Sequence, residues 1–321
     1  MSKYSSAHKR SEIHQFPIIF SVIPTFNRVA MLRECVESLI AQSESVIRIV
    51  IVNSGSTIET EEMIKNFSME SANKIKLINV SEDVWWAECM NIGIEYSLSQ
   101  GAKYVLAMND DTHLDQNALK YLLQTSTKYK ESIIGGIVKD KLGSDQMINN
   151  GYGARFTKYR WLPYKKIVGS VEGRDIFYTE GQSGRGVLFP KSVYERVGLY
   201  DIANFSHRGD RDFSYRCLKA GVGQYLDSGA TVYLNFETSY QGLASKKLTF
   251  ADVIKSLFHM NGLYNVIHQY NFLKKHYHYT WPLWLVIWFL FVLFISAIRM
   301  MPYGTVIIKS VFGGKRYASN S

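Results

Sequence analysis

The first part of the chain alternates short apolar runs with segments in which apolar residues recur at helical spacing. The short runs predict buried strands, and the helical spacing predicts amphipathic helices. The expected strands are 16–23, 47–52, 75–80 and 104–108, and the helices expected between and before them are 29–41, 59–67 and 86–98. Strands that alternate with helices predict a largely parallel sheet covered by helices, an α/β fold.

The second part of the chain has a less regular pattern. Glycine, lysine and aromatic residues between 138 and 178 predict loops and short strands. Regular elements return as a strand at 186–190, helices at 191–197 and 211–220, and a closing strand at 231–234. Helical spacing from 248 to 276 then leads into 281–298, which is 18 residues long and carries no charge.

The apolar run at 281–298 is about 27 Å long as a helix, close to the thickness of a bilayer's hydrocarbon core. A spanning helix would place the tail after the run outside the cytoplasm. This tail holds more basic residues than the segment before the run, whereas basic residues tend to stay on the cytoplasmic side of a spanning helix. Three arrangements stay open: the run spans or re-enters the membrane, lies in its interface, or packs against protein.

Polar residues follow several of the expected strands. Asn27, Asn53 and the acidic triplet, which we define as Asn109, Asp110 and Asp111, come at or directly after strand ends. In parallel sheets, ligands bind beyond the carboxyl ends of the strands. Carboxylate oxygens there suit Mg²⁺ or Mn²⁺, so the triplet, expected to face solvent, is a candidate metal site. The competing interpretation is a polar turn in which Asp111 or Thr112 caps the next helix.

Composition narrows the class of protein. With 321 residues and 46% hydrophobic content, the chain is long enough for a catalytic domain and an appendage. The net charge of +9 favours anionic partners such as phosphate groups, nucleic acid or acidic lipid. The three cysteines show no metal-ligand or disulfide pattern. No secretory signal peptide is evident before residue 16, so we expect the main domain in the cytoplasm.

Four blocks of residues, in order, resemble the family 2 glycosyltransferases, particularly the bacterial rhamnosyl, O-antigen or capsule type. The blocks are 22–28, 51–57, 85–111 and 184–216. The resemblance covers about 16–235 and implies the GT-A fold, a Rossmann-like mixed, mostly parallel sheet flanked by helices. It divides the chain into a polar tail at 1–15, a catalytic domain at 16–240, a helical linker at 241–280, and an apolar membrane-associated helix with a basic tail at 281–321.

The resemblance also assigns roles on the donor side. The donor contacts that it implies are Thr25, Asn27, Arg28, Asn53, Asn91 and Asp110, with Asn53 standing where the family usually has Asp. The implied metal ligands are Asn109, Asp111 and Asn235, and Asn235 stands where many members have His. The adjacent Trp85 and Trp86 are expected either to shape a local pocket or to belong to the core.

On the acceptor side, the resemblance aligns Asp210 with the catalytic base of an inverting transfer. Such a base removes the proton from the attacking hydroxyl. The family's usual Glu before it is Gly209 here. We expect Asp212 to cap and orient the following helix. Arg185, Gly186 and Arg208 complete the acceptor side, with the arginines suited to phosphate.

The sequence therefore predicts transfer of one sugar from a nucleoside-diphosphate sugar to a lipid-linked or other glycan acceptor, at the cytoplasmic face of the inner membrane. The alternative is a catalytically silent nucleotide-sugar-binding or scaffold protein that retains the fold. A sugar nucleotidyltransferase is disfavoured, because 24–27 lacks a glycine-rich phosphate loop. The lysines at 246–247 and 274–275 lead into the apolar run, which indicates a membrane interface and no nucleic acid.

Overall fold

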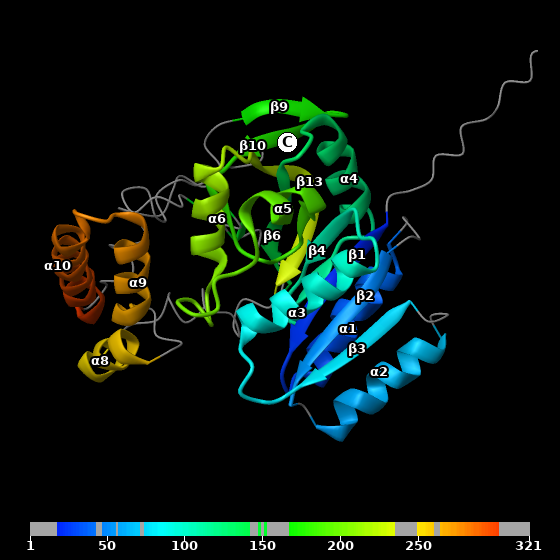
Figure 1. Ribbon diagram of the computed structural model, residues 1–321, viewed down its shortest axis with the longest axis horizontal. Helices are drawn as coiled ribbons and strands as arrows, with labels where there is room; N and C mark the ends of the chain where they lie inside the picture. Colours follow the sequence, from blue (N-terminus) through cyan, green and yellow to red (C-terminus); the bar gives the residue numbers. More distant parts are fainter. Residues whose placement is uncertain are drawn as a thin grey trace, which may run out of the picture.

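The computed structural model describes residues 18–42, 47–55, 57–70, 74–141, 147–148, 151–152, 167–234, 249–259 and 264–301. A central sheet crosses the catalytic part of the chain, with helices on both faces, and three further helices lie to one side (Figure 1). The strand order is β3-β2-β1-β4-β12-β6-β13-β10-β9.

The first half of the sheet is parallel, as the sequence pattern predicts. It consists of β1 (Ile19–Thr25), β2 (Ile47–Ser54), β3 (Ile75–Val80) and β4 (Tyr104–Ala107). Two strands end later than expected, because Thr25 pairs with Asn53 and Asn53 with Asn79. Pairing with neighbouring strands therefore outweighs the turn preference of these residues, and the polar ends of β1 and β2 are held in the sheet.

The second half of the sheet is mixed. β12 (Val187–Pro190) runs antiparallel to β4 and to β6 (Ile133–Asp140), whereas β13 (Gln224–Leu234) is parallel to β6. The sheet continues with β10 (Arg174–Tyr178) and β9 (Ile167–Val171), and β5 (Thr112–Leu114) and β7 (Met147–Ile148) pair with β13 and β6. β8 (Gly151–Tyr152) and β11 (Gly181–Gln182) form a separate pair.

Two hydrophobic cores lie on opposite faces of the sheet, since alternate strand residues point to opposite sides. One core is formed with α1 (Val29–Ile40), α2 (Ile58–Glu70) and α4 (Ala118–Lys128). The other is formed with α3 (Trp86–Ser99), α5 (Lys191–Val197) and α6 (Asp210–Lys219). The expected α/β sheet flanked by helices is thus confirmed, with antiparallel pairing more extensive than the sequence pattern suggests.

The C-terminal part of the described chain is helical. It comprises α8 (Phe250–Phe258), α9 (Val266–His276) and α10 (Trp281–Met300). α10 is long and apolar enough to cross a membrane, and no other helix among the described residues meets that criterion. Figure 1 shows α9 between α10 and the catalytic domain, on the side of α6. The single helical stretch expected at 248–276 is two helices.

Candidate active site

The parallel and mixed halves of the sheet meet at the end of β4, where the acidic triplet begins. The backbone oxygen of Asn109 accepts hydrogen bonds from the N–H (3.2 Å) and hydroxyl (2.8 Å) of Thr112, so the triplet forms a tight turn into β5. Two expectations are wrong. Asp110 is only 5% exposed instead of facing solvent, because the turn folds back onto β1 and α1. The next element is a strand, and the cap of α4 is Asn117.

Asp110 is held by two residues that follow from β1. Thr25 donates its hydroxyl to Asp110 Oδ2 at 2.9 Å, and Arg28 Nη1 lies 3.1 Å from Oδ1. Burial raises the pKa of Asp110 to about 6, against the effect of the Arg28 charge, and the neighbouring Asp111 raises it further. The structure therefore brings Thr25, Arg28 and Asp110 together as the sequence predicts.

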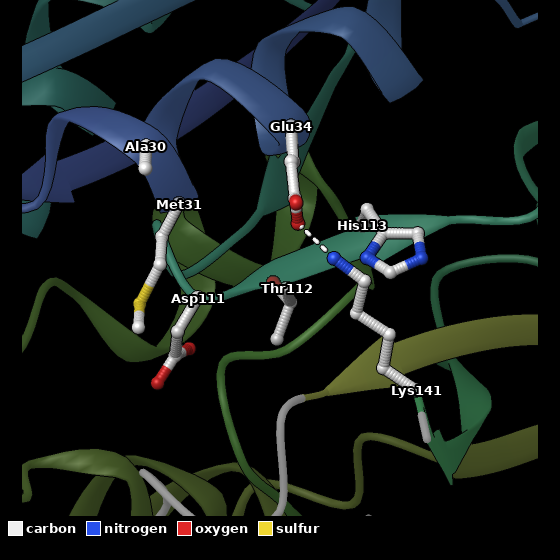
Figure 2. Close-up of a pocket in the computed structure, with 7 residues that line it drawn as sticks. All are labelled: Ala30, Met31, Glu34, Asp111, Thr112, His113 and Lys141. Atoms are coloured by element: carbon white, nitrogen blue, oxygen red, sulfur yellow. Dashed lines mark hydrogen bonds and ion pairs between the residues drawn. The ribbon is translucent and has the colours of Figure 1, made fainter. Parts of the chain in front are cut away.

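Asp111 is the second carboxylate of the triplet. Its Oδ2 lies 3.6 Å from Arg28 Nη1, and its buried Oδ1 has no hydrogen-bond partner in the described part of the chain. Figure 2 shows Asp111 at one end of a pocket of about 220 Å³, between the start of α1, β5 and the end of β6. The ion pair of Glu34 with Lys141 lines the other end. A carboxylate oxygen beside a pocket that has no described partner can bind an external cation or an external hydrogen-bond donor.

A divalent cation fits this site only with help from a ligand. The described residues contain no group of three His, Cys, Asp or Glu side chains that could hold a metal. Asn109 Oδ1 accepts a hydrogen bond from Trp86 Nε1 at 3.0 Å, and Asp110 Oδ1 is bonded to Arg28. Asp111 is thus the best-placed protein ligand, and phosphate oxygens would have to supply others. Asn235, the third expected ligand, lies outside the described residues.

The two asparagines at the strand ends have different environments. Asn27 adopts a left-handed backbone (φ 51°) and accepts a hydrogen bond from the Thr57 N–H at 3.1 Å. It therefore joins the loop after β1 to the start of α2. Asn53 is only 2% exposed, and its Nδ2 donates to Asn79 Oδ1 at 3.0 Å. In this structure its side-chain amide therefore joins β2 to β3.

Trp86 connects the donor side to the acceptor side. Its indole N–H is bonded to Asn109, while a Cβ built on Gly184 would lie 3.0 Å from the indole ring and 3.6 Å from Asp210 Oδ1. Glycine at 184 thus allows the indole and the Asp210 carboxylate to approach the same backbone. Trp85 instead is partly exposed and lies edge-on to His207. The two tryptophans therefore have separate roles.

Asp210 begins α6 and is partly buried beside Gly184. Burial raises the pKa of Asp210 to about 6, whereas the Arg185 charge and the Gly184 N–H lower it. Its Oδ1 is buried and has no hydrogen-bond partner among the described residues. A carboxyl group of this kind can accept a proton near neutral pH, which a general base must do.

Gly209, where a Glu was expected from the resemblance, has little room for a side chain. A Cβ there would lie 3.0 Å from the Tyr200 ring and 3.4 Å from the Phe205 carbonyl oxygen. Tyr200 is fixed by Asn91, whose amide donates to the Tyr200 carbonyl and accepts from its N–H, both at 2.9 Å. Asn91, expected at the donor, is therefore occupied in positioning the loop before α6.

Gly186 and Arg208 are two other residues that were expected on the acceptor side. Gly186 has φ +64°, and a Cβ there would lie 2.4 Å from Val232, so glycine is required. Its N–H donates to the carbonyl of Ala107, the last residue of β4, at 3.0 Å. Arg208 also has a positive φ (72°), and its carbonyl lies 3.1 Å from His268 Nε2 of α9.

Comparison with known proteins agrees with this arrangement. Residues 21–178 match the sequence profile of Glycosyl transferase family 2. The chain carries a family 2 glycosyltransferase domain. Two further comparisons identify distant relatives in sequence and a solved structure with the same fold.

The dTDP-rhamnosyl transferase RfbF of Shigella flexneri is 24% identical over 213 residues, covering 64% of each chain. A PGL/p-HBAD biosynthesis glycosyltransferase of Mycobacterium tuberculosis is 22% identical over 222 residues, or 68% of this chain and 78% of the relative. The chain thus spans less than two thirds of the Shigella protein. A crystal structure of S. aureus TarS (1–349) has a TM-score of 0.52 at 12% identity and covers 90% of this chain and 82% of that chain, which shows the fold.

Asp212 of the transferase domain does not cap α6 as expected. It is fully buried and contacts Arg216 (2.8 Å), Lys275 (2.8 Å) and His276 (2.7 Å), the last two on α9. Although burial favours the neutral acid, bonds from His276 and Lys275 and the Arg216 charge lower the pKa of Asp212 to about 2. Asp212 therefore fastens α6 to α9.

Further contacts join α9 to α6 and to the loop before it. Arg211, next to the candidate base, donates to Gln269 at 2.9 Å and lies over the Phe272 ring at 3.7 Å. Asn271 donates to the carbonyl of Asn204 in the loop before α6. These contacts could not be predicted from the sequence, since the partners are about 60 residues apart and share no motif. The helical spacing of α9 was the only available signal.

We expect the pH dependence of folding stability to reveal the partly buried Asp210. Because its pKa is raised from 3.8 to about 6, the folded protein binds this proton more tightly than the unfolded chain does. Ionisation therefore costs stability as pH rises from about 4 to 7. Asp210→Asn should increase the free energy of unfolding by an amount that grows over this range, up to about 3 kcal/mol.

Urea denaturation at several pH values would measure this difference. Asp83→Asn is the control, because Asp83 is exposed and should give no pH-dependent gain. An Asp210→Asn effect that is the same at pH 4 and pH 8 would contradict the raised pKa.

Removal of Asp212 should destabilise the protein strongly. Asp212→Ala leaves Arg216, Lys275 and His276 without their shared carboxylate, which should lower the free energy of unfolding by about 3 kcal/mol or more. The matched control is Glu195→Ala, which breaks an exposed ion pair with Lys191 and should cost less than about 1 kcal/mol. Similar losses in the two variants, measured by urea denaturation at pH 7, would refute the role given to α9.

Proposed function

We propose that this protein is an inverting glycosyltransferase that moves one sugar from a nucleoside-diphosphate sugar to a hydroxyl of a lipid-linked glycan. One observation carries the proposal: the Asp210 carboxylate, with an oxygen that has no described partner, lies across Trp86 and Gly184 from the acidic triplet. Trp86 and Gly184 therefore lie between the candidate base and the candidate diphosphate site.

The donor diphosphate would lie at the acidic triplet. Arg28 is half exposed, and its Nη1 lies near both carboxylates. The other N–H groups of its guanidinium can therefore donate to phosphate oxygens. Asp111, with its partnerless oxygen, would hold Mg²⁺ or Mn²⁺ together with phosphate oxygens. When bound, the cation would neutralise the charge that develops on the leaving diphosphate. Asn27 and Asn53 lie at the strand ends on the side proposed for the nucleoside.

Asp210 would take the proton of the acceptor hydroxyl as that oxygen attacks the anomeric carbon. The proton goes to the carboxylate, the new bond forms from oxygen to carbon, and the bond from carbon to the diphosphate oxygen breaks. A base on the side opposite the leaving group gives inversion at that carbon. Arg185, close enough for its charge to lower the pKa of Asp210, helps to keep the base ionised.

The similarity to a dTDP-rhamnosyl transferase supports a deoxyhexose or hexose as the transferred sugar. We place the protein at the cytoplasmic face of the inner membrane, attached through its C-terminal region. Support comes from α10, whose length and apolar composition suit a bilayer. A lipid-linked acceptor would then be concentrated in the same plane as the enzyme.

Asp210→Asn should abolish transfer and leave donor binding intact. A general base contributes about 10²- to 10⁴-fold to rate, and kcat should fall by this factor. For the wild type, kcat/KM should fall about tenfold per pH unit below about pH 6, as Asp210 becomes protonated. Transfer would be measured with radiolabelled nucleotide sugars, and donor affinity by calorimetry.

Asp175→Asn, which replaces an exposed carboxylate of β10, serves as the control and should retain full activity. A catalytically silent scaffold makes the opposite prediction, namely donor binding without turnover in the wild type. Unchanged transfer by Asp210→Asn would remove this residue from its role.

Transfer should depend on a divalent cation bound through Asp111. EDTA should eliminate activity, and Mn²⁺ or Mg²⁺ should restore it. Asp111→Asn should raise the cation concentration needed for half-maximal rate about tenfold or more, because a neutral amide oxygen is a weaker ligand than a carboxylate. Asp175→Asn, at an exposed position of β10, should not change that concentration. Full activity in EDTA would exclude the metal.

A further inference from the structure

α10 has the reverse of the polarity expected for a helix in water. Its two polar residues within the last turns, Ser296 and Arg299, are buried against the protein, and Arg299 donates to the Tyr264 hydroxyl at 3.3 Å. Large apolar side chains such as Val286, Leu290 and Phe294 are exposed instead. A helix that turns its charge inward and its apolar residues outward is adapted to surroundings less polar than water.

α8 adds a second exposed apolar strip beside α10. Phe250 and Phe258 are 70% and 68% exposed and stand eight residues apart, with Ile254 between them on the same side of the helix. The neighbouring side of α8 packs Val253 and Leu257 against Val292 of α10. The two helices therefore belong to one packed unit and present apolar side chains to the outside.

Both ends of α10 lie beside the ends of α9. Its first residue follows α9 after a short turn, and its last turn returns to Tyr264, just before α9 begins. α10 thus runs back along α9, as Figure 1 shows. The opposite side of α9 carries Lys275 and His276, which are bonded to buried Asp212 of the transferase domain. A membrane-spanning α10 would either take these charged groups into hydrocarbon or detach from α9.

The extent of the apolar surface favours lipid over a second protein helix. At about 100° per residue, the exposed apolar residues of α10 cover about 200° of its circumference, whereas a helical partner covers a narrower stripe. Tyr279, fully exposed, and Trp281 stand at the start of α10 next to Lys274, a composition typical of a bilayer interface. The net charge of +9 complements anionic headgroups.

We propose that α8 and α10 dock this protein on an anionic bilayer, with α10 lying in the plane of the interface and both of its ends on the same side. This specifies the membrane attachment proposed above. Because α9 joins this unit to the loop and helix that carry Asp210, docking holds the candidate base at a fixed height above the lipid surface. A lipid-linked acceptor would then reach Asp210 from the bilayer that α10 occupies.

Vesicle flotation with the full chain tests the docking surface. The wild type should float with vesicles of phosphatidylglycerol and phosphatidylcholine, and less with phosphatidylcholine alone. Leu290→Lys and Phe258→Lys should each reduce the bound fraction about tenfold. Ile58→Lys is the matched control: Ile58 is 74% exposed on α2, against 60% for Leu290, and should not affect binding.

Equal losses in all three variants, or no flotation of the wild type, would overturn the proposal. So would a stable dimer in vesicle-free solution that Leu290→Lys dissociates, because the apolar face would then belong to a second copy. Transfer to a soluble acceptor should be unchanged in Leu290→Lys, so that failure of docking and failure of the proposed activity give different results.

Sidedness tests the in-plane orientation. The native cysteines Cys35, Cys89 and Cys217 are buried, so single cysteines can be introduced as Ser319→Cys after α10 and Ser99→Cys in the transferase domain. In spheroplasts treated with a membrane-impermeant maleimide, both sites should be protected, and both should react after lysis. Labelling at 319 but not at 99 in intact spheroplasts would show that α10 crosses the membrane and overturn the proposal.

Discussion

The position of β4 between a parallel and an antiparallel neighbour is the constraint on which the site depends. β1 lies parallel on one side of β4, so their carboxyl ends meet, and Asp110 after β4 is reached by Thr25 from β1. β12 lies antiparallel on the other side, so its beginning meets the same edge. The hydrogen bond from Gly186 to the carbonyl of Ala107 fixes that junction. A different neighbour on either side would separate the acidic triplet from Asp210.

Two of the carboxyl groups at this junction lie in surroundings that favour their neutral form. Burial raises the pKa of Asp110 and of Asp210 to about 6. Arg28 compensates Asp110 through a direct ion pair, whereas the Arg185 charge only partly compensates Asp210. Incomplete compensation is what a general base requires, because a fully paired carboxylate would be too weak a base. Asp212, two residues later, shows that contrast: two cationic partners, Arg216 and Lys275, and a hydrogen bond with His276 make it a structural anchor.

The contacts of Asp212 connect the C-terminal helices to the candidate active site. α9 contacts the loop before α6 and the buried side of α6, so the candidate base is positioned by residues about 60 positions away in the chain. α10 packs on the far side of the same helix. A surface suited to lipid and the residue suited to proton transfer are therefore joined by a single helix. In the docking proposed above, this helix sets the orientation of the transferase domain relative to the bilayer.

The alternation of strands and helices, the strand-end positions of Asn27, Asn53 and the acidic triplet, and the family resemblance could all be predicted from the sequence. These features depend on periodicity and on short motifs, which are local. The folded structure was needed to show that Asp110 is buried, that Trp86 joins Asn109 to Gly184, that Tyr200 crowds Gly209, and that Asp212 binds α9. Each of these depends on contacts between distant segments, and such contacts leave no periodic trace in a single sequence. The same reason explains α10: its apolar composition is readable from the chain, but its inward-facing Arg299 and its return along α9 are properties of packing.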